Sequence, residues 1–114
     1  MDTKKIDFLP EIVTRHPQAD IPLDGVKSHV VQAGDQQFIF MEFERDVEVP
    51  EHSHNAQWGF VLEGEMEITI GGKPRLLKKG ASYFIEKDEI HSAKIKKGSR
   101  DLTLFDQKDR YRIK

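Results

Sequence analysis

The sequence predicts an all-β protein that folds as a sandwich or a barrel. Between residues 25 and 106 the apolar residues fall in short runs, the clearest of which alternates with a period of two, and no stretch shows the 3.6-residue period of an amphipathic helix. Turns rich in glycine and charged residues separate these runs. Many short strands at such spacing are typical of β-sandwiches and β-barrels.

Length and composition narrow the possible functions. The chain has 114 residues, enough for one domain with a real core. Its 18 basic and 20 acidic residues give a net charge of -2, so no basic excess indicates nucleic acid. Cysteine is absent, which excludes disulfides, thiolate metal sites and cysteine nucleophiles. Without an apolar run of signal-peptide or membrane-spanning length, we expect a cytoplasmic protein that does not bind a membrane.

The first 25 residues are expected to form a lead-in segment with little regular structure. Prolines at positions 10, 17 and 22 argue against a long helix there. Its apolar residues could dock on the body of the protein or on a second subunit; they are Phe8, Leu9, Ile12 and Val13.

The barrel is expected over residues 26–106 and a polar tail over 107–114. Strands are predicted at 26–33, 38–44, 47–50, 57–62, 65–70, 75–77, 82–85, 90–95 and 102–105. Gly71 and Gly72 supply the positive φ angles that a tight hairpin needs between two of these strands.

One predicted strand is apolar on both faces. One face carries Trp58, Phe60 and Leu62, and the other carries Gln57, Gly59 and Val61. Apart from the glutamine both faces are apolar, so other parts of the protein must shield each of them from water. Either the lead-in segment or a second subunit covers the Trp58 side. A homodimer is therefore one of two predictions for this face.

Histidines mark a candidate metal site. Side chains two apart on a strand share a face, so His52 and His54 can converge on one point. Imidazole is a common ligand of the later first-row metals. Gln57 and His91 are the candidates for the remaining ligands, whereas His29 is expected to be an ordinary strand histidine.

The segment from residue 46 to residue 64 resembles the first motif of the small single-domain cupins, the conserved-barrel cupin 2 family. That motif has a glycine, five residues, His-x-His, three or four residues, an acid, six residues and a glycine. His52, His54 and Gly64 match, whereas Asp46 stands in place of the first glycine. Gln57 stands in place of the acid, and only two residues separate it from His54.

A second cupin motif resembles residues 80–91. Gly80 and His91 match its glycine and histidine at the expected spacing, while Glu86 and Asp88 occupy the positions of its usual proline and glycine. The resemblance covers roughly residues 26–106. It implies a double-stranded β-helix, or jelly-roll barrel, with one divalent transition metal in its mouth: zinc, nickel, iron, manganese or copper. The implied ligands are His52, His54, Gln57 and His91, although the shortened gap before Gln57 also allows this residue to hydrogen-bond to the site without binding the metal.

The glutamine has chemical consequences of its own. Three imidazoles and an amide leave the charge of a divalent ion uncompensated, which favours an anionic small molecule in the open positions. Gln57 cannot accept a proton, so a general base must come from elsewhere. Arg110 or Arg112 could hold a substrate carboxylate if the tail folds over the mouth, although a solvated tail is the expectation for both. Five aromatic residues are candidates to line the pocket, namely Phe38, Phe40, Trp58, Tyr83 and Phe105.

Three functions remain open. The first is a metal-dependent enzyme acting on a sugar acid, because the chain resembles the pectin-degradation cupins that convert unsaturated uronates to linear keto sugars. Those cupins carry an aspartate two residues before a phenylalanine of the last strand, where this chain has Thr103 before Phe105, so the resemblance implies loss of the proton-transfer group. The second is a cupin dioxygenase, and the third is a non-catalytic module that binds a metal or small molecule.

Overall fold

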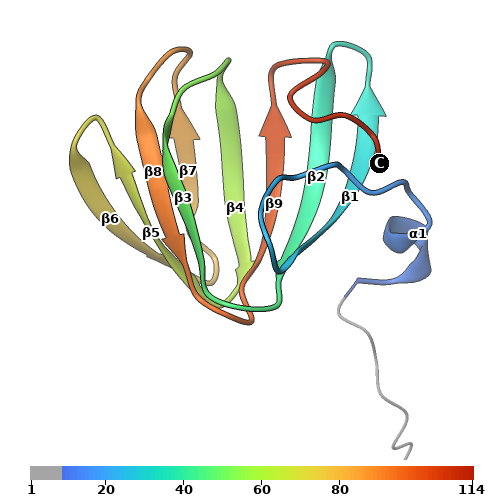
Figure 1. The fold of residues 1–114 in the computed structure, drawn as a ribbon, viewed down its shortest axis with the longest axis horizontal. Helices are drawn as coiled ribbons and strands as arrows, with labels where there is room; N and C mark the ends of the chain where they lie inside the picture. Colours follow the sequence, from blue (N-terminus) through green and yellow to red (C-terminus); the bar gives the residue numbers. More distant parts are fainter. Residues whose placement is uncertain (1–8) are drawn as a thin grey trace, which may run out of the picture.

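The computed structural model describes residues 9–114 and confirms the all-β prediction. Two antiparallel sheets face each other, and the only helix among the described residues is the single turn α1 (Glu11–Thr14) (Figure 1). The strands are β1 (Val26–Ala33), β2 (Gln36–Phe43), β3 (Val47–His52), β4 (Gln57–Glu63), β5 (Glu65–Ile70), β6 (Lys73–Lys78), β7 (Ser82–Ile85), β8 (His91–Ile95) and β9 (Arg100–Phe105). No helix within residues 9–114 is long and apolar enough to cross a membrane.

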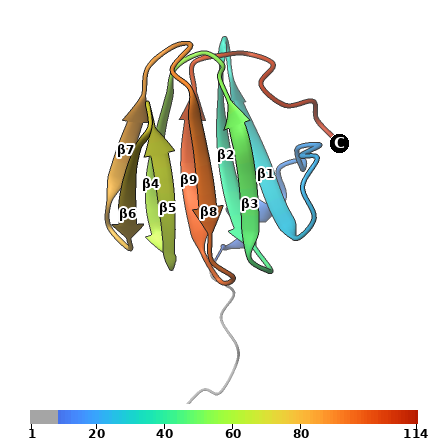
Figure 2. The ribbon, with the colours of Figure 1, turned by 60° about the vertical axis from the view of Figure 1, so that its left-hand side comes forward.

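The strands pair in nested order. The two sheets run β1-β2-β9-β4-β7 and β3-β8-β5-β6 (Figure 2). Thus β5 pairs with β6, β4 with β7, β3 with β8 and β2 with β9, as if one long hairpin with its tip at Gly71 and Gly72 were wrapped around itself. This is the connectivity of a jelly-roll barrel. Strand β1 extends one sheet beyond the eight strands of that core.

The apolar core lies between the sheets and closes one end of the barrel. It consists of Phe43, Val47, Val61, Met66, Ile68, Leu77, Tyr83, Ile85 and Ile95. At the closed end the Ser99 hydroxyl donates to Glu65 O at 2.9 Å and accepts from Glu65 N at 3.1 Å. Gly64 has φ +81°, and a Cβ there would lie 2.7 Å from Ser99 Cα, so only glycine fits this turn.

Buried polar side chains tie the lead-in segment and the tail to the sheet. The Ser28 hydroxyl accepts a bond from Ala19 N at 3.0 Å. The Gln37 amide donates to Tyr111 O at 3.0 Å and accepts from Tyr111 N at 3.2 Å. A purely apolar sheet could not offer these hydrogen-bonding groups. The tail is therefore folded back onto the barrel next to its open end (Figure 1).

The apolar residues of the lead-in segment have different environments. Leu9 is buried on its own chain and Val13 is half-buried, whereas Ile12 is 63% exposed. Phe8 lies outside the described residues.

Candidate metal centre

Three histidines meet at the open end of the barrel. His52 is the last residue of β3 and lies opposite His91, the first residue of β8, in the antiparallel register. His54 comes from the loop that follows β3. One nitrogen of each ring can be chosen so that the three atoms lie within 4.8 Å of one another. The group therefore has the size and the donor type of a three-histidine metal site.

The structure places His54 differently from the sequence prediction. The predicted shared face of His52 and His54 assumed one continuous strand, but β3 ends at His52 and its register shifts between Val49 and His52. The loop after β3 therefore places His54, and the two rings converge with centroids 5.1 Å apart.

Backbone carbonyls orient all three rings. The Nδ1 atoms of His52, His54 and His91 lie 2.8, 2.6 and 2.8 Å from the carbonyl oxygens of residues 50, 55 and 89. A carbonyl oxygen only accepts hydrogen bonds, so each Nδ1 carries the proton. Each Nε2 is left with a free lone pair, which is the arrangement that metal-binding histidines show.

The histidine nitrogens lie close enough together to share a cation. His54 Nε2 and His91 Nε2 lie 3.1 Å apart, and both are acceptors in the tautomer that the carbonyls select. Burial lowers the pKa of His54 to about 4, a value that includes a smaller lowering by nearby Arg110 and an opposing effect of the hydrogen bond to the Asn55 carbonyl. Burial also lowers the pKa of His91, with a smaller contribution from His52. Both rings are therefore neutral near pH 7, and a metal ion fits this donor set better than a proton does.

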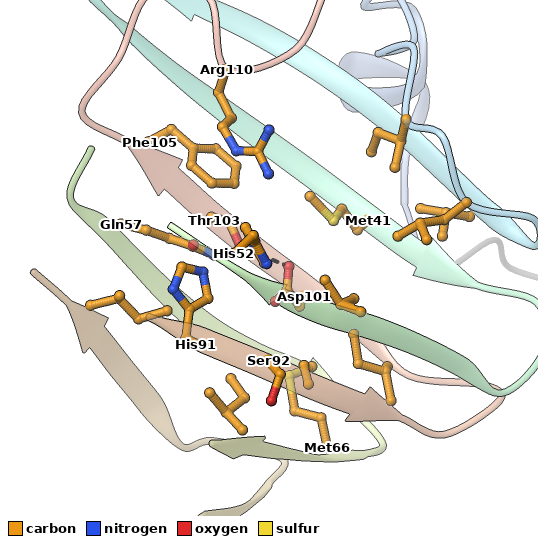
Figure 3. A pocket seen from close by; sticks show the side chains of 18 of the residues that line it. Met41, His52, Gln57, Met66, His91, Ser92, Asp101, Thr103, Phe105 and Arg110 are labelled. Atoms are coloured by element: carbon orange, nitrogen blue, oxygen red, sulfur yellow. Dashed lines mark hydrogen bonds between the residues drawn. The ribbon is translucent and has the colours of Figure 1, made fainter. Parts of the chain in front are cut away.

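Gln57 reaches the same cavity from the start of β4. Its side chain lines the cavity with the three histidines and points into it beside His91 (Figure 3). Its Nε2 lies 3.5 Å from the hydroxyl of Tyr83, which directs the amide nitrogen toward the sheet.

The predicted aromatic lining needs correction. Tyr83 and Phe105 line the cavity, whereas Phe38, Phe40 and Trp58 do not. Successive strand residues point to opposite faces, and the register places these three on the side of the sheet away from the cavity.

Arg110 also lines this cavity, which corrects the expectation of a solvated tail. Its guanidinium carbon lies 4.3 Å from the ring centroid of Tyr111 and 5.6 Å from that of Phe105. Within residues 9–114, its Nε is buried and has no hydrogen-bond partner. Figure 3 shows the side chain above the cavity beside Phe105. Arg112 is exposed and borders only a neighbouring surface groove.

Sequence reasoning missed a buried carboxyl group in the same cavity. Asp101 is 3% exposed and lies on the inward face of β9, two residues before Thr103. It accepts hydrogen bonds from the hydroxyls of Tyr83 at 2.8 Å and Thr103 at 3.0 Å. The alternation of Asp101, Thr103 and Phe105 along one strand face was the signal that could have identified it.

Burial shifts the proton affinity of this group. It raises the pKa of Asp101 to about 6, against the opposing effect of the hydrogen bonds from Tyr83 and Thr103. Burial and the adjacent Asp101 also raise the pKa of the Tyr83 hydroxyl well above its usual value. Gly59 makes room for the arrangement, since a Cβ there would lie 2.0 Å from Tyr83 Cζ.

Comparison with known families assigns the fold. The sequence model of the family described as Cupin domain matches residues 39–107, which include all four candidate ligands. The chain belongs to the cupin domain family. This confirms the resemblance and the predicted jelly-roll barrel.

Individual relatives of this cupin include one protein of pectin degradation. It is 28% identical over 89 residues to the pectin degradation protein KdgF of Dickeya dadantii, in an alignment that covers 75% of this chain and 81% of that protein. An RmlC-like cupin of Shewanella frigidimarina has TM-score 0.72 and 21% identity, covering 84% of this chain and 87% of that one. KdgF from a Halomonas species has TM-score 0.70 and 20% identity, covering 84% and 91%. The two solved structures support the cupin fold alone.

Proposed function

We propose that this cupin is a metal-dependent enzyme that isomerises a small sugar acid, with an unsaturated uronate as its first candidate substrate. The observation that carries the proposal is that three imidazoles with free Nε2 lone pairs and the guanidinium of Arg110 border one cavity. The similarity to KdgF of Dickeya dadantii supports the choice of a uronate.

In this proposal four side chains hold one divalent transition metal. His52, His54 and His91 supply nitrogen ligands, and Gln57 supplies its amide oxygen. The set suits zinc, nickel, iron, manganese or copper and does not choose among them. When bound, the metal supplies a Lewis acid that polarises an oxygen of the substrate.

Arg110 is proposed to hold the carboxylate of the substrate. The proposed ligands are all neutral, so the loaded site is cationic, and Arg110 adds a further positive charge at the same cavity. Its Nε lacks a partner within residues 9–114, although it is buried. A carboxylate can accept two parallel bonds from a guanidinium and would satisfy this group. Stacking on Tyr111 fixes the orientation of the guanidinium in advance.

Asp101 is proposed to move the proton. An isomerisation shifts a proton within the substrate and needs no oxidant, so the site needs a group that accepts and returns a proton. The Asp101 carboxyl lines the cavity, and its raised pKa of about 6 lies close to neutral pH, where such groups work best. Asp101 thus offers a carboxyl group at the cavity, although residue 103, where the pectin-degradation cupins carry an aspartate, is a threonine.

The test combines metal analysis with turnover. Protein purified without affinity nickel should contain close to one transition-metal ion per chain by plasma mass spectrometry, and it should remove the ultraviolet absorbance of an unsaturated uronate. The double variant His52→Ala/His91→Ala should lose metal and activity. His16→Ala is the matched control, because His16 lies in the lead-in segment outside the cavity.

Other outcomes distinguish the alternative functions. Stoichiometric metal without uronate turnover contradicts the isomerase. If that metal is iron, copper or manganese, oxygen uptake with a panel of small acids tests the dioxygenase. If it is zinc, the non-catalytic binding module becomes the better hypothesis. Metal retention in the double variant contradicts the ligand assignment itself.

A further inference from the structure

Two hydroxyl groups hold the buried carboxyl group of Asp101. Its Oδ2 accepts a hydrogen bond from the Tyr83 hydroxyl at 2.8 Å, and its Oδ1 accepts one from the Thr103 hydroxyl at 3.0 Å. All three side chains are buried and line the cavity. These two hydroxyl groups are therefore the partners with which Asp101 can exchange a proton without breaking its hydrogen bonds.

The strand register places Asp101 deeper in the barrel than Thr103. In the pairing of β4 with β9, Thr103 lies opposite Gly59, two residues from Gln57, and Asp101 lies opposite Val61, four residues from Gln57. At about 3.3 Å per residue, Thr103 is about 7 Å and Asp101 about 13 Å along the strand from the level of Gln57. Figure 3 shows Thr103 between Gln57 and Asp101. A ligand that enters past the histidines therefore meets Thr103 first.

The Tyr83 hydroxyl is already used within the protein. It donates its only proton to Asp101 Oδ2, and its oxygen lies 3.5 Å from Gln57 Nε2, which can only donate. Gly59 provides the room for this ring, since a Cβ at position 59 would overlap it. Tyr83 therefore holds one oxygen of Asp101 in place and leaves Oδ1, the oxygen bonded to Thr103, better placed to exchange a proton.

The Thr103 hydroxyl has the capacity that the Tyr83 hydroxyl lacks. A threonine hydroxyl carries one proton and two lone pairs. The proton goes to Asp101 Oδ1, and the one other contact of the oxygen within residues 9–114 is a long one of 3.4 Å to the Tyr83 hydroxyl. At least one lone pair of Thr103 Oγ1 is therefore open to a donor group of a ligand in the cavity.

We propose that Asp101 exchanges its proton with the substrate through the hydroxyl group of Thr103 rather than by direct contact. The inference rests on the proposed isomerase and assigns a further residue to its proton transfer. Thr103 is then the catalytic residue that touches the substrate, and Asp101 stores the proton behind it. Tyr83 is a positioning residue, because it acts through Asp101.

The relay serves both proton transfers of the isomerisation. Opening of an unsaturated uronate removes the proton of the hydroxyl on ring carbon C1, breaks the bond from C1 to the ring oxygen and adds a proton at C4. The electron pair of the O–H bond forms the C1 carbonyl, the pair of the ring bond forms the C5 carbonyl, and the pair of the C4–C5 double bond takes the proton. No oxidant is needed.

The same hydrogen bond carries the proton in both directions. As the substrate hydroxyl gives its proton to Thr103 Oγ1, Thr103 gives its own proton to Asp101 Oδ1. The second step reverses these transfers, so that Asp101 returns a proton to Thr103 and Thr103 delivers one to C4. Asp101 ends as the carboxylate with which it began.

Removal of the hydroxyl group tests the relay. Thr103→Val keeps the shape of the side chain without the hydroxyl, whereas Thr103→Ser keeps the hydroxyl. In metal-loaded protein, Thr103→Val should lower kcat for the unsaturated uronate by about 100-fold or more and change KM by less than about three-fold. Thr103→Ser should keep kcat within about five-fold of the native value. Thr69→Val is the matched control, because Thr69 lies on β5 outside the cavity, and it should change neither constant.

Two further measurements do not depend on turnover. Plasma mass spectrometry should find close to one metal ion per chain in all three variants. In metal-free protein, the hydrogen bond from Thr103 opposes the effect of burial and lowers the pKa of Asp101. Its loss in Thr103→Val should raise that pKa, so the stability that comes from proton binding by Asp101 should be lost at higher pH than in the native protein. Urea unfolding at a series of pH values measures this, and Thr103→Ser should keep the native pH range.

Distinct results would overturn the relay and the isomerase. Near-native kcat in folded, metal-loaded Thr103→Val overturns the relay and leaves the isomerase standing. Equal losses of kcat in Thr103→Val and Thr103→Ser overturn it as well, because the hydroxyl group would then not be the feature that matters. Loss of metal in Thr103→Val does the same, since the residue would then act on the metal site. Absence of turnover in the native metal-loaded protein overturns the isomerase itself and the relay with it. If valine prevents folding, Thr103→Ala takes its place with the same expectations.

Discussion

The inward face of the five-stranded sheet carries several polar side chains among its apolar core residues, whereas the central rows of its outward face are mostly apolar. Toward the barrel interior the sheet presents Gln37, Gln57, Asp101 and Thr103, of which all but Gln57 are buried. Toward the outside it presents aromatic residues that include Phe38, Phe40, Trp58 and Phe84. A sheet that served only to cover a core would not need these polar side chains on its inward face.

The difference teaches which polar groups are structural and which are available for chemistry. Buried polar groups need partners, and Gln37 finds its partner in the backbone of Tyr111. Asp101 is bonded to Tyr83 and Thr103, yet it also lines the cavity. The interior face thus anchors the tail at one position and equips a cavity at another.

Of the substitutions on this sheet, that of Gly59 should lower the free energy of unfolding most. Gly59→Ala places a methyl group against the buried ring of Tyr83, and we expect about 3 kcal/mol or more of destabilisation. Urea unfolding followed by circular dichroism measures it. Combining it with Tyr83→Leu should cost less than the sum of the two single changes. Additive effects would show that the ring and the glycine are not in contact.

The pH dependence of stability tests the buried carboxyl group. The pKa of Asp101 is raised from 3.8 to about 6, so the folded protein binds its proton more tightly than the unfolded chain does. The tighter proton binding contributes to the free energy of unfolding. This contribution is fully present below pH 3.8 and is lost as the pH rises through about 6. The loss amounts to about 2 to 3 kcal/mol.

Asp101→Asn should remove this part of the pH dependence of the free energy of unfolding. Unfolding free energies measured in urea between pH 4.5 and 7.5 provide the readout. Asp35→Asn, in the exposed turn between β1 and β2, is the control and should keep the native slope. An unchanged slope in Asp101→Asn would mean that the carboxyl group is not desolvated.

The smallest expected effect concerns the two tail arginines. Arg110→Gln should weaken binding of a small carboxylate to the metal-loaded protein about 10-fold, or by about 1.4 kcal/mol, because one charge-assisted contact is lost. Arg112→Gln should change it less than about two-fold, since Arg112 does not line the cavity. Isothermal titration calorimetry measures both. Equal effects of the two variants would indicate general attraction by positive charge rather than a specific contact.

The sequence was informative where periodicity governs the structure. Alternating apolar residues and glycine turns were enough to predict an all-β barrel, and the resemblance to two cupin motifs was enough to group His52, His54 and His91. The first signal is local, and the second consists of two short motifs that are each local. They could be recognised without knowing how the strands pair.

The remaining parts of the site depend on register and on chain ends. Asp101 enters the cavity only because β9 pairs between β2 and β4 with its odd-numbered residues inward. Arg110 reaches the mouth because Gln37, more than 70 positions earlier, bonds to the backbone beside it. The same parity turns Phe38, Phe40 and Trp58 outward. No local pattern in the sequence specifies these long-range contacts.

The nested pairing of the strands also has a consequence for folding kinetics. His52 and His91 are 39 positions apart and meet only when β3 has paired with β8. Such non-local contacts make a chain fold slowly, because the entropy of loop closure is lost before the contacts form. We therefore expect the imidazoles to converge late, after the hairpin tip between β5 and β6 has formed. Metal capture during refolding would mark completion of the barrel rather than its nucleation.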